Sequence, residues 1–441
     1  TEVQKLLASE KREGDNFGAS VSIDGDTAVI GTNTGDAAYV FTRSGGTWTQ
    51  QARLLASDKN DGDYFGKSVS IDGDTAVIGA INSSESGTVE NGAAYLFTRS
   101  AGIWTQQAKL LASDKASFDG FGVSVAIDGD TAVIGAQRAS GSGTDRSGAA
   151  YVFTRSAGYW TQQAKLLASD AASGDEFGVS VSIDGNTAVI GARLKSDGRT
   201  EENGAAYVFT RSAGTWTQQA KLLASDKTDF DAFGSAVAID SDTAVIGAYA
   251  NASAGSAYVF KRSAGTWTQQ AKLLASDRTS LDLFGGSVAI DGDTVVIGAS
   301  GEDDGDEEYG AAYVFTMSAG TWSQQAKLLA SDRVGYERLG SSVVIDGDTA
   351  VIGAPEEDDS GTRDNGAVYV FDISQAGSPP SGPVLSFENS PTASEGRYLT
   401  FLLTLSEPAS DNVSFDIQSA DETATAPDDY DPKTGRRMLA V

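Results

Sequence analysis

The chain has 441 residues, of which 40% are hydrophobic, enough for a large core and more than one domain. Its 61 acidic and 32 basic side chains give a formal net charge of −29, which excludes nucleic acid and anionic membrane surfaces as expected partners. Because cysteine and histidine are absent, disulfides, thiol chemistry and the usual transition-metal ligands are excluded. No apolar run is long enough for membrane insertion.

The first predicted element is a strand over residues 3–8, which matches the last strand of each later repeat but has no repeat of its own before it. A Phe-Gly pair follows and recurs along the chain at intervals of 48 to 56 residues. The copies are Phe17-Gly18, Phe65-Gly66, Phe121-Gly122, Phe177-Gly178, Phe233-Gly234, Phe284-Gly285 and, in altered form, Leu339-Gly340. Self-similarity at this period is typical of repeat architectures.

Each repeat is predicted to contain four short strands, which in the second copy cover residues 68–72, 75–80, 93–99 and 104–112. Asp72-Gly73 joins the first two strands and is a strong signal for a tight hairpin. The first strand carries small and β-branched residues that suit a crowded central axis, whereas the third and fourth carry the aromatic ones. Four consecutive strands in a unit of about 50 residues are typical of a propeller blade.

The last predicted strand of the repeat region, residues 366–371, is a third strand that no fourth strand follows. We expect the strand over residues 3–8 to pair with it as the outermost strand of the last blade, which closes the ring and removes its open end. The predicted fold is therefore all-β, a seven-bladed β-propeller of four-stranded antiparallel blades over residues 1–373.

A Ser/Pro/Gly-rich linker is predicted over residues 374–382, and a short β-sandwich-like segment over residues 383–441. The predicted strands of this segment include residues 383–387, 399–405 and 413–417. Half a sandwich cannot bury both of its faces. We expect the segment either to accept a strand from a neighbouring copy or to pack on a propeller.

The order Phe-Gly, a hydrophobic strand ending in Ile-Gly-Ala, and Gly-Ala-Ala-Tyr-Val-Phe resembles the FG-GAP repeat of the integrin α-subunit propeller and of many bacterial surface proteins. This resemblance covers roughly residues 1–373 and implies a propeller that is extracellular and engaged in adhesion or recognition. Residues 383–441 resemble the first half of a Calx-β domain, an immunoglobulin-like sandwich of calcium-dependent surface proteins, whose later strands and final acidic pair are missing here.

The sequence also departs from the FG-GAP pattern. The full Gly-Ala-Pro occurs only at residues 353–355, and the calcium loop that integrin-type repeats often carry is reduced to a turn such as Asp128-Gly129-Asp130. Two carboxylates on a tight turn cannot surround an ion that needs about six to eight oxygens. These turns are therefore interpreted as plain hairpins.

The densest acidic runs, residues 302–308 and 356–359, occupy the same loop of adjacent blades. Close like charges repel unless a cation or solvent screens them, so the runs are either calcium sites or solvated loops. Calcium is the candidate cofactor, and its candidate ligands are Asp303, Asp304, Asp306, Glu356, Asp358 and Asp359, with Glu395 and Asp429 in the C-terminal segment. Acidic residues also recur five positions apart before Phe-Gly, as in Asp58 and Asp63, and are interpreted as caps of the loop backbone rather than metal ligands.

The loops between second and third strands and those before each Phe-Gly vary most, and both sets are expected on one face of the disc. Variable loops on a constant scaffold indicate recognition, with unconstrained drift as the alternative. Aromatic residues on these loops either bind sugars or pack locally: Tyr64, Phe118, Phe230, Tyr249, Tyr309 and Tyr336.

No nucleophile motif, phosphate-binding glycine loop or unique carboxylate pair is found, so no enzymatic activity is expected, and a carbohydrate-active enzyme ranks last. The leading hypothesis is an extracellular or cell-surface adhesion module, with or without calcium, that binds protein or glycan through the variable loops. The alternative is a structural subunit of an extracellular filament or sheath, whose partners are copies of itself joined through the C-terminal segment.

Overall fold

The computed structural model describes residues 1–85, 87–140, 145–196, 198, 201–303, 309–333, 335–358 and 361–374, and the backbone of 385–388, 402–405, 413–417 and 435–439. The chain divides into two compact units, Thr1–Ala376 and Gly377–Val441. No helix of the described residues is long and apolar enough to cross a membrane.

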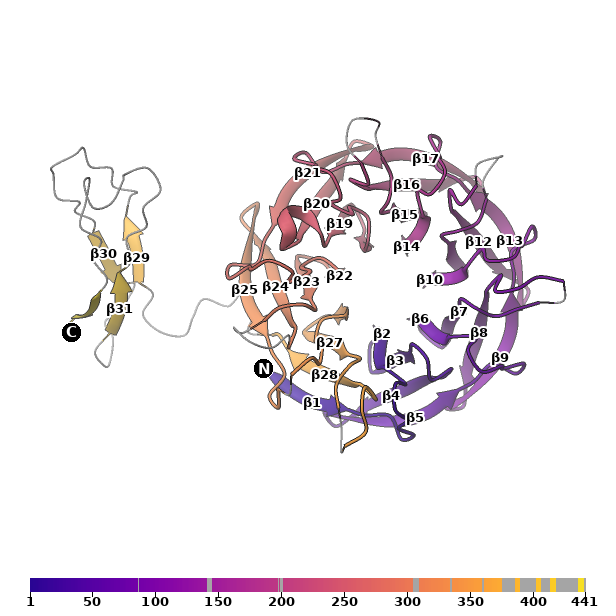
Figure 1. Ribbon diagram of the computed structural model, residues 1–441, viewed down its shortest axis with the longest axis horizontal. Helices are drawn as coiled ribbons and strands as arrows, with labels where there is room; N and C mark the ends of the chain where they lie inside the picture. The colour runs from indigo at the N-terminus through magenta and orange to yellow at the C-terminus, as the bar shows by residue number, and fades with distance from the viewer. Residues whose placement is uncertain are drawn as a thin grey trace. The chain divides into compact units, whose positions relative to one another are not determined.

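The first unit is a ring of seven four-stranded antiparallel sheets, counted over the described residues, around a central opening (Figure 1). The first three blades contain β2 (Phe17–Asp24), β3 (Thr27–Thr32), β4 (Ala38–Ser44), β5 (Thr47–Leu54); β6 (Phe65–Asp72), β7 (Thr75–Ala80), β8 (Ala93–Ser100), β9 (Ile103–Leu110); and β10 (Phe121–Asp128), β11 (Thr131–Ala136), β12 (Ala149–Ser156), β13 (Tyr159–Leu166).

The next three blades repeat this order with consecutive strands. They contain β14 (Phe177–Asp184), β15 (Thr187–Ala192), β16 (Ala205–Ser212), β17 (Thr215–Leu222); β18 (Val237–Asp240), β19 (Thr243–Ala248), β20 (Ser256–Ser263), β21 (Thr266–Leu273); and β22 (Ser287–Asp291), β23 (Thr294–Ala299), β24 (Ala311–Ser318), β25 (Thr321–Leu328). A short 3₁₀ helix, η1 (Asn251–Ser253), lies in the loop between β19 and β20.

The seventh blade joins the two ends of the repeat region. It contains β26 (Ser342–Asp346), β27 (Thr349–Ala354), β28 (Ala367–Asp372) and, as its outermost strand, β1 (Glu2–Leu6). β1 pairs antiparallel with β28, and Leu6 lies opposite Val368. The predicted seven-bladed propeller and its closure by the N-terminal strand are thus confirmed.

The core lies between neighbouring blades. Phe65 of the second blade is fully buried, its ring 5.4 Å from that of Tyr95 and 6.0 Å from that of Phe97. The same apolar cluster includes Val40 and Leu54 of the first blade. Because each buried aromatic side chain contributes roughly 2 kcal/mol by leaving water, this shared layer is the main force that holds one blade to the next.

In the second unit, β29 (Leu385–Glu388) pairs with β30 (Leu402–Leu405), and β31 (Val413–Ile417) pairs with β32 (Gly435–Leu439). The predicted strand over residues 413–417 coincides with β31. The predicted linker, residues 374–382, lies outside the described residues apart from Ser374. The resemblance of this unit to half a Calx-β domain remains a prediction.

Candidate functional site

The strand order gives the propeller two different faces. The two-residue turns between first and second strands and the Ser-Ala-Gly turns between third and fourth strands lie on one face, here the turn face. The connections between second and third strands and those leading to each Phe-Gly pair lie on the other, here the loop face. The two loop sets touch: the Phe118 amide donates to the Val89 carbonyl at 2.9 Å, and the Phe230 amide to the Glu201 carbonyl at 2.8 Å. This confirms that both variable loop sets share one face.

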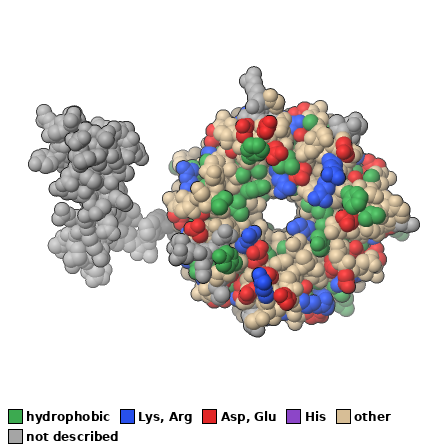
Figure 2. Space-filling model, viewed as in Figure 1, with side chains coloured by type: hydrophobic (Ala, Val, Ile, Leu, Met, Phe, Trp, Pro, Cys, Tyr) green, Lys and Arg blue, Asp and Glu red, His purple; other side chains and the backbone are tan. Residues whose placement is uncertain are grey.

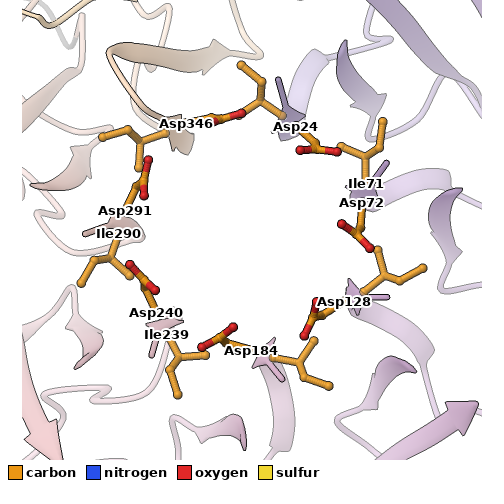
Figure 3. Close-up of a pocket in the computed structure, with 14 residues that line it drawn as sticks. Asp24, Ile71, Asp72, Asp128, Asp184, Ile239, Asp240, Ile290, Asp291 and Asp346 are labelled. Atoms are coloured by element: carbon orange, nitrogen blue, oxygen red, sulfur yellow. The ribbon is translucent and has the colours of Figure 1, made fainter. Parts of the chain in front are cut away.

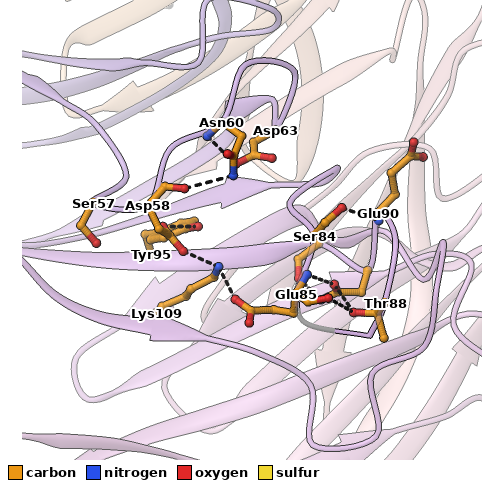
Figure 4. Close-up of polar contacts among 12 residues, drawn as sticks. Ser57, Asp58, Asn60, Asp63, Ser84, Glu85, Thr88, Glu90, Tyr95 and Lys109 are labelled. Carbon is orange, nitrogen blue, oxygen red and sulfur yellow. Dashed lines mark hydrogen bonds and ion pairs between the residues drawn. The ribbon is translucent and has the colours of Figure 1, made fainter.

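A polar network beneath the loop face ties each blade to the next (Figure 4). Asp58, which follows the last strand of the first blade, accepts hydrogen bonds from the Tyr95 hydroxyl at 2.9 Å and from Lys109 Nζ at 2.6 Å. Lys109 also pairs with Glu85 at 2.5 Å. The same trio recurs as Tyr151–Asp114–Lys165, Tyr207–Asp170–Lys221, Tyr258–Asp226–Lys272, Tyr313–Asp277–Lys327 and Tyr369–Asp332–Lys5.

The charges in this network are held in their ordinary ionised forms. Burial acts to raise the pKa of Asp58, but the hydrogen bonds from Lys109 and Tyr95 outweigh it and the net pKa is lowered. Burial acts to lower the pKa of Lys109, but its hydrogen bonds to Asp58 and Glu85 outweigh burial and the net pKa is raised. Burial is the main cause that raises the pKa of Tyr95. A carboxylate, an ammonium and a neutral phenol fixed in this way favour a structural role over proton transfer near neutral pH.

The second acidic residue of each pair caps the loop backbone, as the sequence predicts. Asp63 accepts a hydrogen bond from the Asn60 amide at 3.1 Å, Asp119 from Ala116 at 2.7 Å and Asp175 from Ala172 at 2.6 Å. These carboxylates therefore fix the loops that lead into each Phe-Gly pair.

Two acidic residues beside the predicted metal ligands have lysine partners. Glu302 is 5% exposed and forms an ion pair with Lys327, and Glu357 is 2% exposed and forms one with Lys5. Burial is the main cause that raises the pKa of Glu302. In the second blade the equivalent position is Ser83, and Glu85, two residues farther along the same loop, pairs with Lys109.

Three of the eight predicted metal ligands belong to the described residues. Asp303 and Asp358 are exposed, and Glu356 pairs with Arg338 at 3.2 Å. The other five, Asp304, Asp306, Asp359, Glu395 and Asp429, lie outside the described residues. Within the described part of the chain, no group of three or more acidic side chains is placed to hold a metal ion. The calcium hypothesis therefore stays a prediction.

A ring of seven aspartates surrounds one end of the channel on the turn face, around a cavity of about 300 Å³ (Figure 3). They are Asp24, Asp72, Asp128, Asp184, Asp240, Asp291 and Asp346. Each accepts a hydrogen bond from the turn of the following blade, for example from the Gly73 amide to Asp24 at 2.6 Å, and Asp346 closes the ring by accepting from Gly25 at 2.5 Å. The sequence predicted hairpins here but not this bonding between blades.

A second channel cavity, of about 270 Å³, is lined mainly by serine and valine. Lys67 is the single charged side chain in its lining, and burial lowers its pKa. The serine hydroxyls are engaged, since Ser68 donates to the Gly122 carbonyl at 2.9 Å and Ser124 to that of Gly178 at 2.9 Å. The channel is therefore built largely from bonds between blades.

The family model for the FG-GAP repeat matches seven segments, each of which covers the outermost strand of one blade and the first three strands of the next: residues 1–45, 48–97, 104–153, 160–209, 216–260, 267–315 and 322–371. The chain belongs to the FG-GAP repeat family. FG-GAP repeats are typical of extracellular proteins, and the family is consistent with a recognition or adhesion module.

Other comparisons add little to the description of this FG-GAP propeller. Among solved structures it is similar to Saccharomyces cerevisiae Sqt1, at 11% sequence identity over 92% of this chain and 96% of that chain, with a TM-score of 0.48. A search of curated proteins found no match.

Three of the six aromatic residues predicted on the loops face solvent. Phe118, Phe230 and Tyr336 are exposed. Tyr64, Tyr249 and Tyr309 are half-buried, and the Arg333 guanidinium lies 5.2 Å from the centre of the Tyr309 ring. On the face of the propeller shown in Figure 2, hydrophobic side chains form separate patches among acidic and basic ones. The FG-GAP loops thus combine locally packed rings with rings that are free to meet a ligand.

Proposed function

We propose that this FG-GAP propeller is an extracellular, non-enzymatic recognition module that binds a protein or a glycan through its loop face. The observation that carries the proposal is the difference between the two faces. The turn between first and second strands has two residues in every blade, whereas the connection between second and third strands ranges from residues 33–37 in the first blade to 81–92 in the second. Variation confined to one face of a constant scaffold is the usual arrangement of a binding surface.

The chemistry of the loops supports the same proposal. The position of Glu302 in the sixth blade is taken by Lys195 in the fourth and by Asn251 in the fifth. Lys195 reverses the sign of this position and bonds Asp175 at 2.9 Å, while Asn251 accepts from Lys272 at 2.7 Å. These blades therefore hold their loops by different contacts and present different surfaces.

The test uses arrays of glycans and of extracellular proteins, probed with the fluorescent full-length protein. In one variant the seven-residue connection 249–255 replaces residues 193–204, and in a matched control Asp74 and Asp130 of the turn face are changed to Asn. We expect the loop variant to lose array ligands that the control keeps. If variants with the loop replaced in each blade still bound the same array ligands, binding through the loops would be contradicted. Loss of the array signal on addition of a chelator would support calcium assistance.

A second candidate is a structural subunit of an extracellular filament or sheath. It is supported by the second unit, in which the described strands form two two-stranded sheets, since a two-stranded sheet alone is only marginally stable. A neighbouring copy that adds a strand would stabilise this unit. Light scattering should then show larger assemblies for the full chain than for residues 1–376, and monomers of both would remove the support for this candidate.

A further inference from the structure

One loop position combines a left-handed backbone with very different side chains. It lies three residues before the Phe or Leu of each Phe-Gly pair. Three blades place glycine there: Gly14 (φ 75°), Gly62 (φ 88°) and Gly174 (φ 82°). The other four place a large apolar residue there: Phe118 (φ 68°), Phe230 (φ 64°), Leu281 (φ 74°) and Tyr336 (φ 68°). We call these four residues the apolar quartet.

The left-handed backbone has a structural cause that does not require a side chain. The amide at this position donates to the variable loop of the preceding blade: Gly174 to Arg146 at 3.1 Å, Phe230 to Glu201 at 2.8 Å and Leu281 to Ser253 at 2.7 Å. Glycine makes this bond without strain, whereas a bulky residue at positive φ is strained. The backbone therefore explains the conformation but not the apolar quartet.

Burial does not offset this strain. Phe118 is 48% exposed, Phe230 55%, Leu281 68% and Tyr336 59%. A Cβ added at Gly14, Gly62 or Gly174 would meet no atom within 4 Å, so the position faces open space in those blades too. Ile103 and Tyr159 on the turn face are also exposed, but they lie in strands and have no positive φ, and isolated exposed residues of that kind are ordinary. Strain together with exposure indicates a functional contact.

The surroundings of Phe230 favour a particular partner. Phe230 lies beside three exposed carboxylates, those of Glu201, Glu202 and Asp229. The Phe230 amide donates a hydrogen bond to the Glu201 carbonyl, and the Glu201 amide donates one to the Asp229 carboxylate. A second copy of this chain, with its net charge of −29, would bring like charges together there. A sugar stacks on aromatic rings but gains no such contact from Leu281.

We infer that the apolar quartet forms the anchoring contacts of the loop face for a protein partner whose apolar side chains are flanked by lysine or arginine. Interfaces depend on a few apolar or aromatic anchors, while surrounding charges steer the partner into register. This inference rests on the proposed function and names the partner class of the same face.

The experiment compares two fourfold glycine variants. The first is Phe118→Gly, Phe230→Gly, Leu281→Gly and Tyr336→Gly. The control is Ala101→Gly, Ala157→Gly, Ala213→Gly and Ala264→Gly, four turn-face residues that also have positive φ. The probe is a synthetic peptide of alternating leucine and lysine, with leucine-glutamate and serine-lysine peptides of equal length as references. Calorimetry measures binding, and thermal unfolding measures stability.

We expect the native protein and the control to bind the leucine-lysine peptide and neither reference, and the quartet variant to bind it at least tenfold more weakly. The quartet variant should melt no lower than the native protein, because glycine relieves strain at these positions. Equal binding by the quartet variant, no binding by the native protein, or equal binding of a reference peptide would overturn the inference. A clear loss of melting temperature in the quartet variant would overturn it as well, since the side chains would then serve the fold.

The array experiment separates this inference from the proposed function. If loop replacement abolishes an array ligand but the quartet variant keeps it, the loop face is a binding surface and the quartet is not its anchor. If loop replacement leaves all array ligands bound, the proposed function itself is contradicted.

Discussion

Gly353 lies directly against Gly18 across the junction of the last and first blades, where a Cβ added at Gly353 would be 2.0 Å from the Gly18 carbonyl oxygen. The same relation recurs between all neighbouring blades, for example 2.1 Å from Gly79 to Gly122 and 1.9 Å from Gly191 to Gly234. The glycine of Ile-Gly-Ala thus packs against the glycine of the next Phe-Gly pair. Both repeat glycines are needed because the blades meet backbone to backbone near the axis.

Gly353→Ala should therefore strain the closure of the ring. Because the atom in the way belongs to the backbone, we expect a loss of about 3 kcal/mol in the free energy of unfolding, measured by urea denaturation. The matched control is Gly347→Ala, where a Cβ meets nothing within 4 Å and only the positive φ of 55° opposes it, at a cost of about 1 kcal/mol. Equal losses in the two variants would show that close packing at Gly18 is not the cause.

Lys5→Met should also weaken ring closure, because Lys5 on β1 pairs with the buried Glu357 and with Asp332 of the sixth-to-seventh blade link. A buried carboxylate that loses its cation costs about 3 kcal/mol in the free energy of unfolding. The control Lys165→Met removes an ion pair with the half-exposed Asp114 and a hydrogen bond to the Ser140 carbonyl. We expect it to lower the free energy of unfolding by less than about 1 kcal/mol. A similar effect of both changes in urea denaturation would refute a special role of Glu357.

The propeller could be predicted from the sequence because its determinants are local and repeated. The strand predicted over residues 75–80 coincides with β7, since an Asp-Gly turn and a run of β-branched residues define both of its ends. Ring closure followed from the same repeat, because β1 and β28 are the unpaired remainders of one blade.

The contacts of the loops could not be predicted in the same way. Asp58 meets Tyr95 and Lys109 of the next blade, 37 and 51 residues away, and nothing local in the sequence pairs them. The acidic run beginning at Glu302 was therefore interpreted through its own charges rather than through Lys327. The backbone strain of Phe230 was missed as well, although the alternation of glycine and phenylalanine at one repeat position was a usable signal.

Met317→Arg should stabilise the sixth blade. In the second blade Arg99 donates to Asp74 at 2.6 Å and to Thr27 at 2.8 Å, and its guanidinium lies 5.3 Å from the centre of the Trp104 ring. Met317 occupies this register position opposite Trp322. An arginine there should add about 1 kcal/mol to the free energy of unfolding, and Arg262→Met in the fifth blade should remove a similar amount. No gain from Met317→Arg alongside a loss from Arg262→Met would mean that the sixth blade does not offer the same site.

Asp226→Asn should change how the protein responds to acid. Burial opposes ionisation of Asp226, but bonds from Lys272 and Tyr258 outweigh it and lower its pKa below the ordinary 3.8. A lowered folded-state pKa adds stability that is fully present above the unfolded-state value and is lost as the pH falls through the folded-state value. Native stability should therefore fall as the pH drops below the ordinary 3.8, and this part of the fall should be smaller in Asp226→Asn, which is already less stable at pH 7. Urea midpoints across this range provide the measurement, with the fully exposed Asp61→Asn as control. If Asp226→Asn followed the native curve at every pH, the carboxylate between the blades would contribute nothing to folding.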